Sequence, residues 1–234
     1  MKKELKQGTV EAGKDPARRL DLLWEIVDAA VDLDDHVERA AALEKAIFDL
    51  EGLARSSPSA AVHYALGYAW YFHPQRQHSR TVWGVVEDYL GRACCECPED
   101  PYIWLYWGHN AYEYGNYQVA LDRFEHVDLA RFDTRYMRLR AVEMMLCCEI
   151  MISGTESALE TLERFVVLCE AGEPEDVFPT NLDQALKRRG LAVSVSAQPR
   201  MREALCRLDK AAKAGPWFAD LLEGEVTDHQ SKCT

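Results

Sequence analysis

The stretch from Ile103 to Glu125, IWLYWGHNAYEYGNYQVALDRFE, has the spacing of two successive helices. Apolar residues recur every three or four positions before Gly115, and the same period resumes beyond it. Gly108 and Ala120 are small where two paired helices approach most closely, whereas Phe124 is large where the pair packs against its neighbours. Gly115 suits the turn, since a positive φ costs glycine little. The stretch therefore predicts a helical hairpin.

This hairpin resembles one unit of the tetratricopeptide-repeat family, whose pattern is W-x2-L-G-x2-Y, then A-x3-F, then P. The matching positions are Trp104, Trp107, Gly108, Ala111, Gly115, Tyr117, Ala120, Phe124 and Val127. Trp107 replaces the usual leucine, Ala111 the usual tyrosine, and Phe132 stands near the expected proline. The resemblance implies a right-handed α-solenoid whose concave groove is lined by the first helix of each pair. It also implies a role in binding proteins or peptides.

The helical period continues on both sides of this hairpin, and glycines and prolines divide the chain at regular intervals. Asp15 and Pro16 form a good helix start, because a capping aspartate precedes a proline in the first turn. The sequence predicts four helix pairs, at about 16–31 and 36–54, 61–72 and 81–95, 102–114 and 117–128, and 134–152 and 155–170. Short turns join these helices, so successive helices should pack antiparallel.

Changes in composition mark the expected domain boundaries. Residues 1–15 form a polar N-terminal tail, 16–173 the tetratricopeptide-like repeat array, 174–226 a C-terminal helical cap and 227–234 a polar tail. Within the cap, 182–190 and 200–213 have helical patterns, while 192–199 is compatible with a strand or a turn. A cap suits a solenoid, because the last repeat would otherwise expose its apolar face. The expected fold is an all-α solenoid of antiparallel helix pairs with a C-terminal helical cap.

The charge balance bears on the class of partner. Lysine and arginine number 27 against 39 aspartates and glutamates, which gives a formal net charge of -12. The field of such a chain repels a phosphate backbone, so nucleic acid is not an expected ligand. Solubility explains the charge most simply, and attraction of a basic protein partner is the sharper alternative.

The sequence predicts neither a secretory signal nor a membrane span. The N-terminal residues MKKELKQGTVEAGKDP lack the apolar stretch that a signal requires. The longest apolar runs, such as 144–148, are far shorter than the roughly 20 residues of a membrane helix. We therefore expect a soluble protein of the cytoplasm that does not engage a membrane.

The cysteines raise the question of a metal site. Eight are present, clustered at 94, 95 and 97 and again at 147 and 148, with 169, 206 and 233 alone. Thiolates bind zinc tetrahedrally, but the paired CxxC motifs of zinc sites are missing. Small buried hydrophobic residues are the favoured role, with Cys233 exposed in the tail, and metal binding by the clusters stays open.

Motifs for catalysis are absent from the sequence. It contains no glycine-rich phosphate loop, no HExxH, no GxSxG and no DxDxDG calcium loop. We therefore expect a protein that is not an enzyme and needs no cofactor.

The repeat register predicts which side chains face the concave groove. They are mostly tyrosines of the first helices, with the tryptophans kept between layers. The predicted groove residues are Tyr64, Tyr68, Tyr71, Tyr102, His109, Tyr112, Glu113 and Tyr136. Tyrosine offers a large contact area and one polar group at modest entropic cost, which suits recognition. The alternative is that several of these rings fill the interior of a tightly wound solenoid.

Two functions follow from these observations. The first is a non-catalytic adaptor that holds an extended or helical segment of another protein in the tyrosine-lined groove. The second is an acidic inhibitor, such as a bacterial immunity protein, that covers a basic partner. Family members that clamp the carboxylates of chaperone C-termini use lysines and asparagines. Tyr64 and Tyr68 stand where a basic residue and an asparagine would be needed, which argues against that specialised role.

Overall fold

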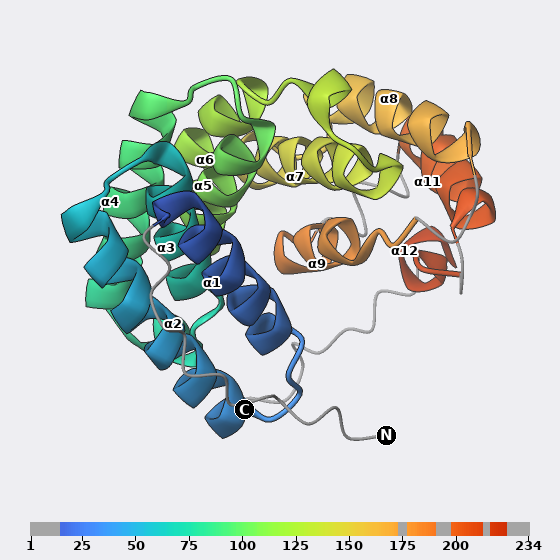
Figure 1. Cartoon of the computed structure of the whole chain (residues 1–234). Helices are drawn as coiled ribbons and strands as arrows, with labels where there is room; N and C mark the ends of the chain where they lie inside the picture. The colour runs from blue at the N-terminus through green and yellow to red at the C-terminus, as the bar shows by residue number, and fades with distance from the viewer. Residues whose placement is uncertain (1–14, 173–176, 191–197, 213–215, 224–234) are drawn as a thin grey trace, which may run out of the picture. The chain divides into compact units, whose positions relative to one another are not determined.

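The computed structural model describes residues 15–172, 177–190, 198–212 and 216–223 (Figure 1). Throughout these ranges the regular secondary structure is helical. Contacts along the chain divide it into two compact units, residues 1–98 and 99–234. The division falls between the second and third helix pairs expected from the sequence.

Unit 1 consists of two helix pairs. Its elements are α1 (Pro16–Val31), α2 (His36–Ser56), α3 (Ala60–Phe72), the 3-10 helix η1 (Pro74–His78) and α4 (Arg80–Glu96). The predicted start of α1 is confirmed, because the Asp15 carboxylate accepts a hydrogen bond from the Ala17 amide at 3.0 Å. Asp35 caps α2 in the same way. Short polar side chains thus define where these helices begin.

The core of unit 1 lies where α2 and α3 pack together, with α1 on one side and α4 on the other. Leu43, Leu50 and Leu66 are completely buried there. Gly67 marks the closest approach of α3 and α4, since a Cβ at this position would stand 2.5 Å from Cδ2 of Leu90. The small residue is therefore required by the helix crossing.

Unit 2 begins with the hairpin that the sequence predicts. Its elements are α5 (Pro101–Glu113), α6 (Tyr117–Glu125), η2 (Leu129–Arg131), α7 (Arg135–Ser153), α8 (Leu159–Glu170), α9 (Thr180–Arg188), α11 (Pro199–Ala211) and α12 (Ala219–Glu223). Gly108 and Phe124 meet between α5 and α6, where an added Cβ would lie 2.5 Å from the ring. Gly115 takes a φ of 86° in the connecting turn. Both assignments made from the sequence are confirmed.

Two helix boundaries in unit 2 differ from the prediction. Helix α6 ends at Glu125 instead of about residue 128, because the chain turns at His126 and a short 3-10 helix follows. Helix α8 begins at Leu159 instead of about residue 155, since Gly154 has a φ of 85° and residues 155–158 form turns. Apolar spacing continues through both turns, so the period alone misplaced the helix ends.

A buried carboxylate fixes α9 against α7. Glu143 accepts hydrogen bonds from the amides of Asn181 and Leu182 at 2.9 and 3.1 Å, and from the Asn181 side chain at 3.0 Å. Arg140 lies beside it at 3.3 Å. Pro179, at the N-cap of α9, makes no side-chain cap hydrogen bond. Glu143 therefore caps α9 from another helix.

Helix α11 packs against α8 through apolar residues and two ion pairs. Arg200 contacts Glu163 at 2.8 Å, and Arg207 contacts Glu170 one heptad further on. The limits of the predicted repeat array and of its cap stay predictions. Most of 192–199, whose structure the sequence left open, lies outside the described residues.

The sequence predicts buried cysteines apart from Cys233, and the structure agrees for four of the seven cysteines that it describes. Cys94, Cys147, Cys148 and Cys169 are buried, Cys97 is half-buried, and Cys95 and Cys206 are exposed. Cys233 lies outside the described residues. Within the described ranges, no three His, Cys, Asp or Glu side chains are grouped in a way that could hold a metal. Among the same residues, no helix combines the length and apolar character that a membrane crossing requires.

Candidate protein-binding surface

Five aromatic rings form a continuous row in unit 1, which we call the aromatic ladder. Its members are Trp24 of α1 and Tyr64, Tyr68, Tyr71 and Phe72 of α3. Every one of the five side chains is half-buried, so each combines packing with an accessible part. The three tyrosines of this row are among the residues that the sequence assigns to a groove.

The rings are in direct succession. The Trp24 ring lies with its centroid 5.4 Å from that of Tyr64 and 5.1 Å from that of Tyr68. Tyr68 is 4.8 Å from Phe72, which in turn stands at right angles to Tyr71 at 4.9 Å. These spacings are those of favourable tilted and edge-to-face aromatic pairs, so the rings hold one another in place.

Helical periodicity explains why the rings share one face of α3. Positions 64, 68 and 72 are four residues apart and therefore lie above one another on the helix surface. The opposite side of α3 carries Val62 and Leu66, which are buried in the core. Burial of that side fixes the rotation of α3, and the ladder faces α1 as a consequence.

Arg76 and His73 support one end of the ladder. The Arg76 guanidinium lies 4.1 Å from the centre of the Tyr71 ring, and this arginine is only 6% exposed. His73 is buried against Trp70, its Nδ1 accepts from the Gln75 amide, and its Nε2 lies 3.7 Å from Glu44. Burial lowers the pKa of His73. The side chains of His73 and Arg76 are therefore buried where α3 passes into η1.

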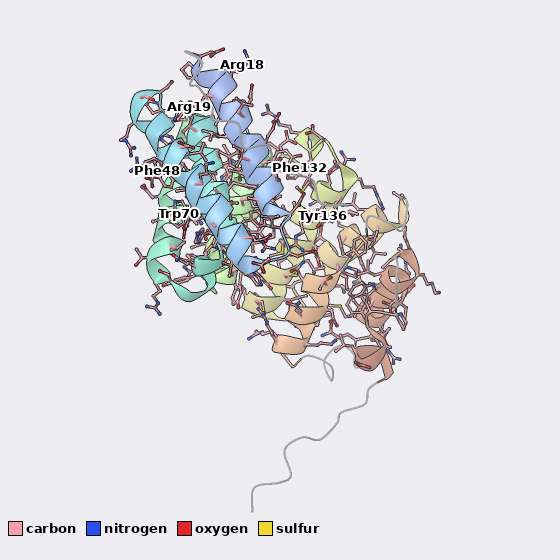
Figure 2. All side chains as sticks on the ribbon, turned by 60° about the horizontal axis from the view of Figure 1, so that its bottom comes forward. Arg18, Arg19, Phe48, Trp70, Phe132 and Tyr136 are labelled. Carbon is pink, nitrogen blue, oxygen red and sulfur yellow. The ribbon has the colours of Figure 1, made fainter. Side chains whose placement is uncertain are left out.

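The predicted groove residues of unit 2 are divided between core and surface. Tyr102, Glu113 and Tyr136 reach the surface, and Tyr136, in the first turn of α7, is 45% exposed (Figure 2). His109 and Tyr112 are only 5% and 7% exposed. These two therefore contribute to the core of unit 2 in the described structure, in line with the packing alternative.

The surroundings of the two buried residues show why they pack inside. The Tyr112 ring meets Tyr117 at 5.3 Å, and burial raises the pKa of its hydroxyl well above the usual range. His109 stands edge-on to Phe124 at 5.5 Å. Both face the second helices of their unit, a direction that the first-helix register alone does not reveal.

Tyr136 borders a hollow on unit 2. The hollow is lined by Tyr136, Leu139, Arg140, Glu143, Phe165, Val177 and Phe178. Tyr102 lies apart from it, with its ring against Phe132 at 5.0 Å and its hydroxyl 3.5 Å from Asp133. The two charged residues that line the hollow, Arg140 and Glu143, form an ion pair with each other, so neither offers an unpaired charge to a ligand. Unit 2 also has rings in succession, since the Trp104 centroid lies 5.5 Å from that of Trp107 and 4.6 Å from that of His126.

The tryptophans are less deeply buried than the sequence suggests. Trp104 is half-buried and stacks on His126 at 4.6 Å, and Trp107 lies beneath the Arg123 guanidinium at 3.9 Å. Trp24, like the other tryptophans expected between the layers, is only half-buried, and it belongs to the ladder. Phe72 was missed altogether, although its position four residues after Tyr68 is a signal that could have revealed it.

Comparison with known proteins adds evidence on the fold. No protein-family model matches the chain. No curated protein matches it either. A solved structure described as "Functional Characterization of Pseudomonas Aeruginosa pilF" is similar, with a TM-score of 0.55, 16% identity and coverage of 86% of this chain and 79% of that one. That structure has a tetratricopeptide-like fold. Together with the packed helix pairs, the similarity confirms the predicted all-α, tetratricopeptide-like class.

Proposed function

We propose that the protein is a non-catalytic adaptor that holds a segment of another protein against the aromatic ladder. The observation that carries this proposal is the row of five half-buried rings on α1 and α3. The tetratricopeptide-like fold supports a role in protein interaction in general terms. The choice of surface comes from the ladder, because a fold by itself does not locate a binding site.

The chemistry of the ladder suits recognition of a polypeptide. Tyrosine rings present apolar faces together with a hydroxyl that can donate or accept a hydrogen bond. Because neighbouring rings already restrict one another, little side-chain freedom remains to be lost on binding. Aromatic side chains of this kind are also enriched among the residues that dominate interface energies.

The predicted groove residues of unit 2 enter the proposal selectively. Tyr102, Glu113 and Tyr136 are retained as candidate contacts because they are accessible. His109 and Tyr112 would need the core of unit 2 to open before they could touch a partner. The proposal therefore rests on Tyr64, Tyr68 and Tyr71 in unit 1.

A second function, the acidic inhibitor, is favoured by one observation, the net charge of -12. Such a protein would be drawn to a basic partner by the long-range field. It would use a broad charged surface, not a row of rings. We give it second place because charge by itself is compatible with simple solubility. Both functions fit a location in the cytoplasm and a partner that is not nucleic acid. The location and the class of partner remain proposals.

The test begins with co-purification of the natural partner from cells, followed by calorimetric titration. Tyr68→Ala and Tyr64→Ala should each weaken binding of the partner by about 2 kcal/mol, the range of aromatic hot spots. Tyr114→Ala is the matched control, because Tyr114 is 43% exposed and lies outside the ladder. Circular dichroism on the same samples establishes that each variant is folded. A folded ladder variant that keeps full affinity would contradict the proposal.

A further inference from the structure

The aromatic ladder lies beside an unusual arrangement of charge on α1. Arg18 and Arg19 occupy the first turn of this helix (Figure 2), while Asp28 and Asp32 occupy its last turn and C-cap. A helix favours the reverse, acidic residues at its N-terminus and basic residues at its C-terminus. The carbonyl end of α1 therefore carries two carboxylates in addition to its own partial negative charge, an order that does not serve the stability of the helix.

The two carboxylates also oppose each other. Asp28 and Asp32 are one helical turn apart, so their side chains are neighbours. Asp28 is exposed but partly shielded from water, and this partial desolvation together with the charge of Asp32 raises its pKa. Among the residues that the structure describes, no basic side chain pairs with either aspartate. A cation placed here by a partner would relieve this repulsion.

The topology of unit 1 shows at which end of the ladder Asp28 and Asp32 lie. Both α1 and α3 pack against α2, and the chain reverses direction at 32–35 and again at 57–59, so α1 and α3 run parallel. Trp24 contacts Tyr64 and Tyr68. Asp28 follows Trp24 by one turn on the same helix face, and it is exposed. The negative charge therefore lies toward the end of the ladder that holds Phe72.

The length of the ladder matches an extended segment. From residue 64 to residue 72 the helix rises about 12 Å, at about 1.5 Å per residue. A polyproline II helix covers the same distance with about four residues, at about 3.1 Å each. Two prolines three positions apart thus fit within the row of rings.

The chemistry of the rings also favours proline. Flat proline rings make good contact with aromatic faces, and proline-rich segments bind aromatic-lined grooves in a conformation that they already adopt when free. Proline has no amide hydrogen, so little polar surface has to be dehydrated, and its carbonyl can accept from a tyrosine hydroxyl. Arg76 is buried on Tyr71 and therefore does not itself present its guanidinium to a bound segment.

We propose that the ladder binds a proline-rich segment in the polyproline II conformation, with a lysine or arginine just beyond the prolines that pairs with Asp28 and Asp32. This inference rests on the proposed adaptor function and specifies its partner. The rings supply the contact area, and the two carboxylates select a basic over an acidic segment.

Calorimetric titration with three synthetic peptides tests the proposal. The first has six prolines followed by two arginines, the second six prolines followed by two glutamates, and the third six alanines followed by two arginines. The first peptide should bind about tenfold more tightly than either of the others. Equal binding of the proline and alanine peptides, or no binding of the first at about 1 mM, would overturn the inference.

Variants then assign each part of the preference. Tyr68→Ala is expected to lower the affinity for the first peptide about tenfold. Tyr64→Ala serves as a second variant if Tyr68→Ala does not fold. Asp28→Asn combined with Asp32→Asn should abolish the preference for arginine over glutamate and retain that for proline over alanine. Tyr114→Ala should change neither. A preference for arginine that survives in the double variant would refute the role of the carboxylates.

The natural partner separates this inference from the adaptor proposal. If its binding depends on Tyr68 while the proline peptides do not bind, the adaptor proposal stands and the proline-rich identity of the partner is wrong. If a folded Tyr68→Ala protein binds both the natural partner and the peptides as the wild type does, both proposals fail.

Discussion

Gly108 and Gly84 are both helical glycines, yet their surroundings differ. A Cβ built on Gly108 would lie 2.5 Å from the Phe124 ring, whereas one built on Gly84 meets nothing within 4 Å. The first glycine is therefore required by packing between α5 and α6. The second only lowers the helix propensity of α4. The same residue type has opposite consequences because its neighbours decide the outcome.

This contrast predicts opposite effects of one substitution. Gly108→Ala should lower the free energy of unfolding by about 1–3 kcal/mol, the usual cost of overpacking. Gly84→Ala should raise it by about 0.5–1 kcal/mol, since alanine is the better helix former. Urea denaturation of the two variants beside the wild type measures both values. Equal effects in the two variants would show that α5 and α6 do not cross at Gly108.

At the scale of elements, α9 depends on a residue that is distant in sequence. Glu143 of α7 accepts hydrogen bonds from the first amides of α9. The N-cap residue of α9, Pro179, makes no side-chain cap hydrogen bond. Helix α9 has only nine residues, so it is too short to be stable by itself. Its order should follow from burial of Leu182 and Leu186 together with this cap.

Two substitutions separate the cap from its charge. Glu143→Leu leaves the amides of Asn181 and Leu182 without their acceptor and should cost about 1–3 kcal/mol. Glu143→Gln keeps a carbonyl oxygen for these amides and should cost less. Hydrogen exchange of the two amides is the local measurement, with fast exchange expected only in the leucine variant. Slow exchange in both variants would mean that Glu143 does not hold α9.

The same residue predicts a dependence on pH. Burial is the largest influence on Glu143 and raises its pKa above the ordinary value of 4.5, against the hydrogen bonds and Arg140. The stabilisation from protonated Glu143 is fully present below the unfolded pKa and is lost as the pH rises through the folded pKa. The unfolding free energy of the wild type, relative to Glu143→Gln, should therefore fall as the pH rises above about 4.5. A difference that stays constant with pH would contradict this prediction.

At the scale of the whole molecule, the formal charge of -12 is the property that bears most on association. A ladder that recognises its partner through rings and one or two basic residues should show only a modest dependence of the association rate on salt. An inhibitor steered by its field should slow steeply as salt screens that field. Stopped-flow association with the co-purified partner at low and high ionic strength distinguishes the two. A steep decline would favour the inhibitor.

The sequence by itself determined the helix pairs. The spacing of Trp104, Gly108, Ala120 and Phe124 reports contacts between helices that are adjacent in the chain, and such local contacts leave a periodic signature. Capping residues such as Asp15 likewise act on their own helix, which is why the start of α1 was predicted correctly. The fold class could be predicted because it follows from these local contacts between successive helices.

Only the tertiary structure decided which tyrosines pack and which stay accessible. Tyr68 and Tyr112 occupy similar places on first helices, yet Tyr112 is buried against Tyr117 while Tyr68 joins a half-exposed row with Trp24 and Phe72. Exposure depends on neighbours from other helices, and the period of one helix carries no record of them. The cap of α9 by Glu143 was hidden in the same way, because 38 positions separate Glu143 from Asn181 and no local pattern connects them.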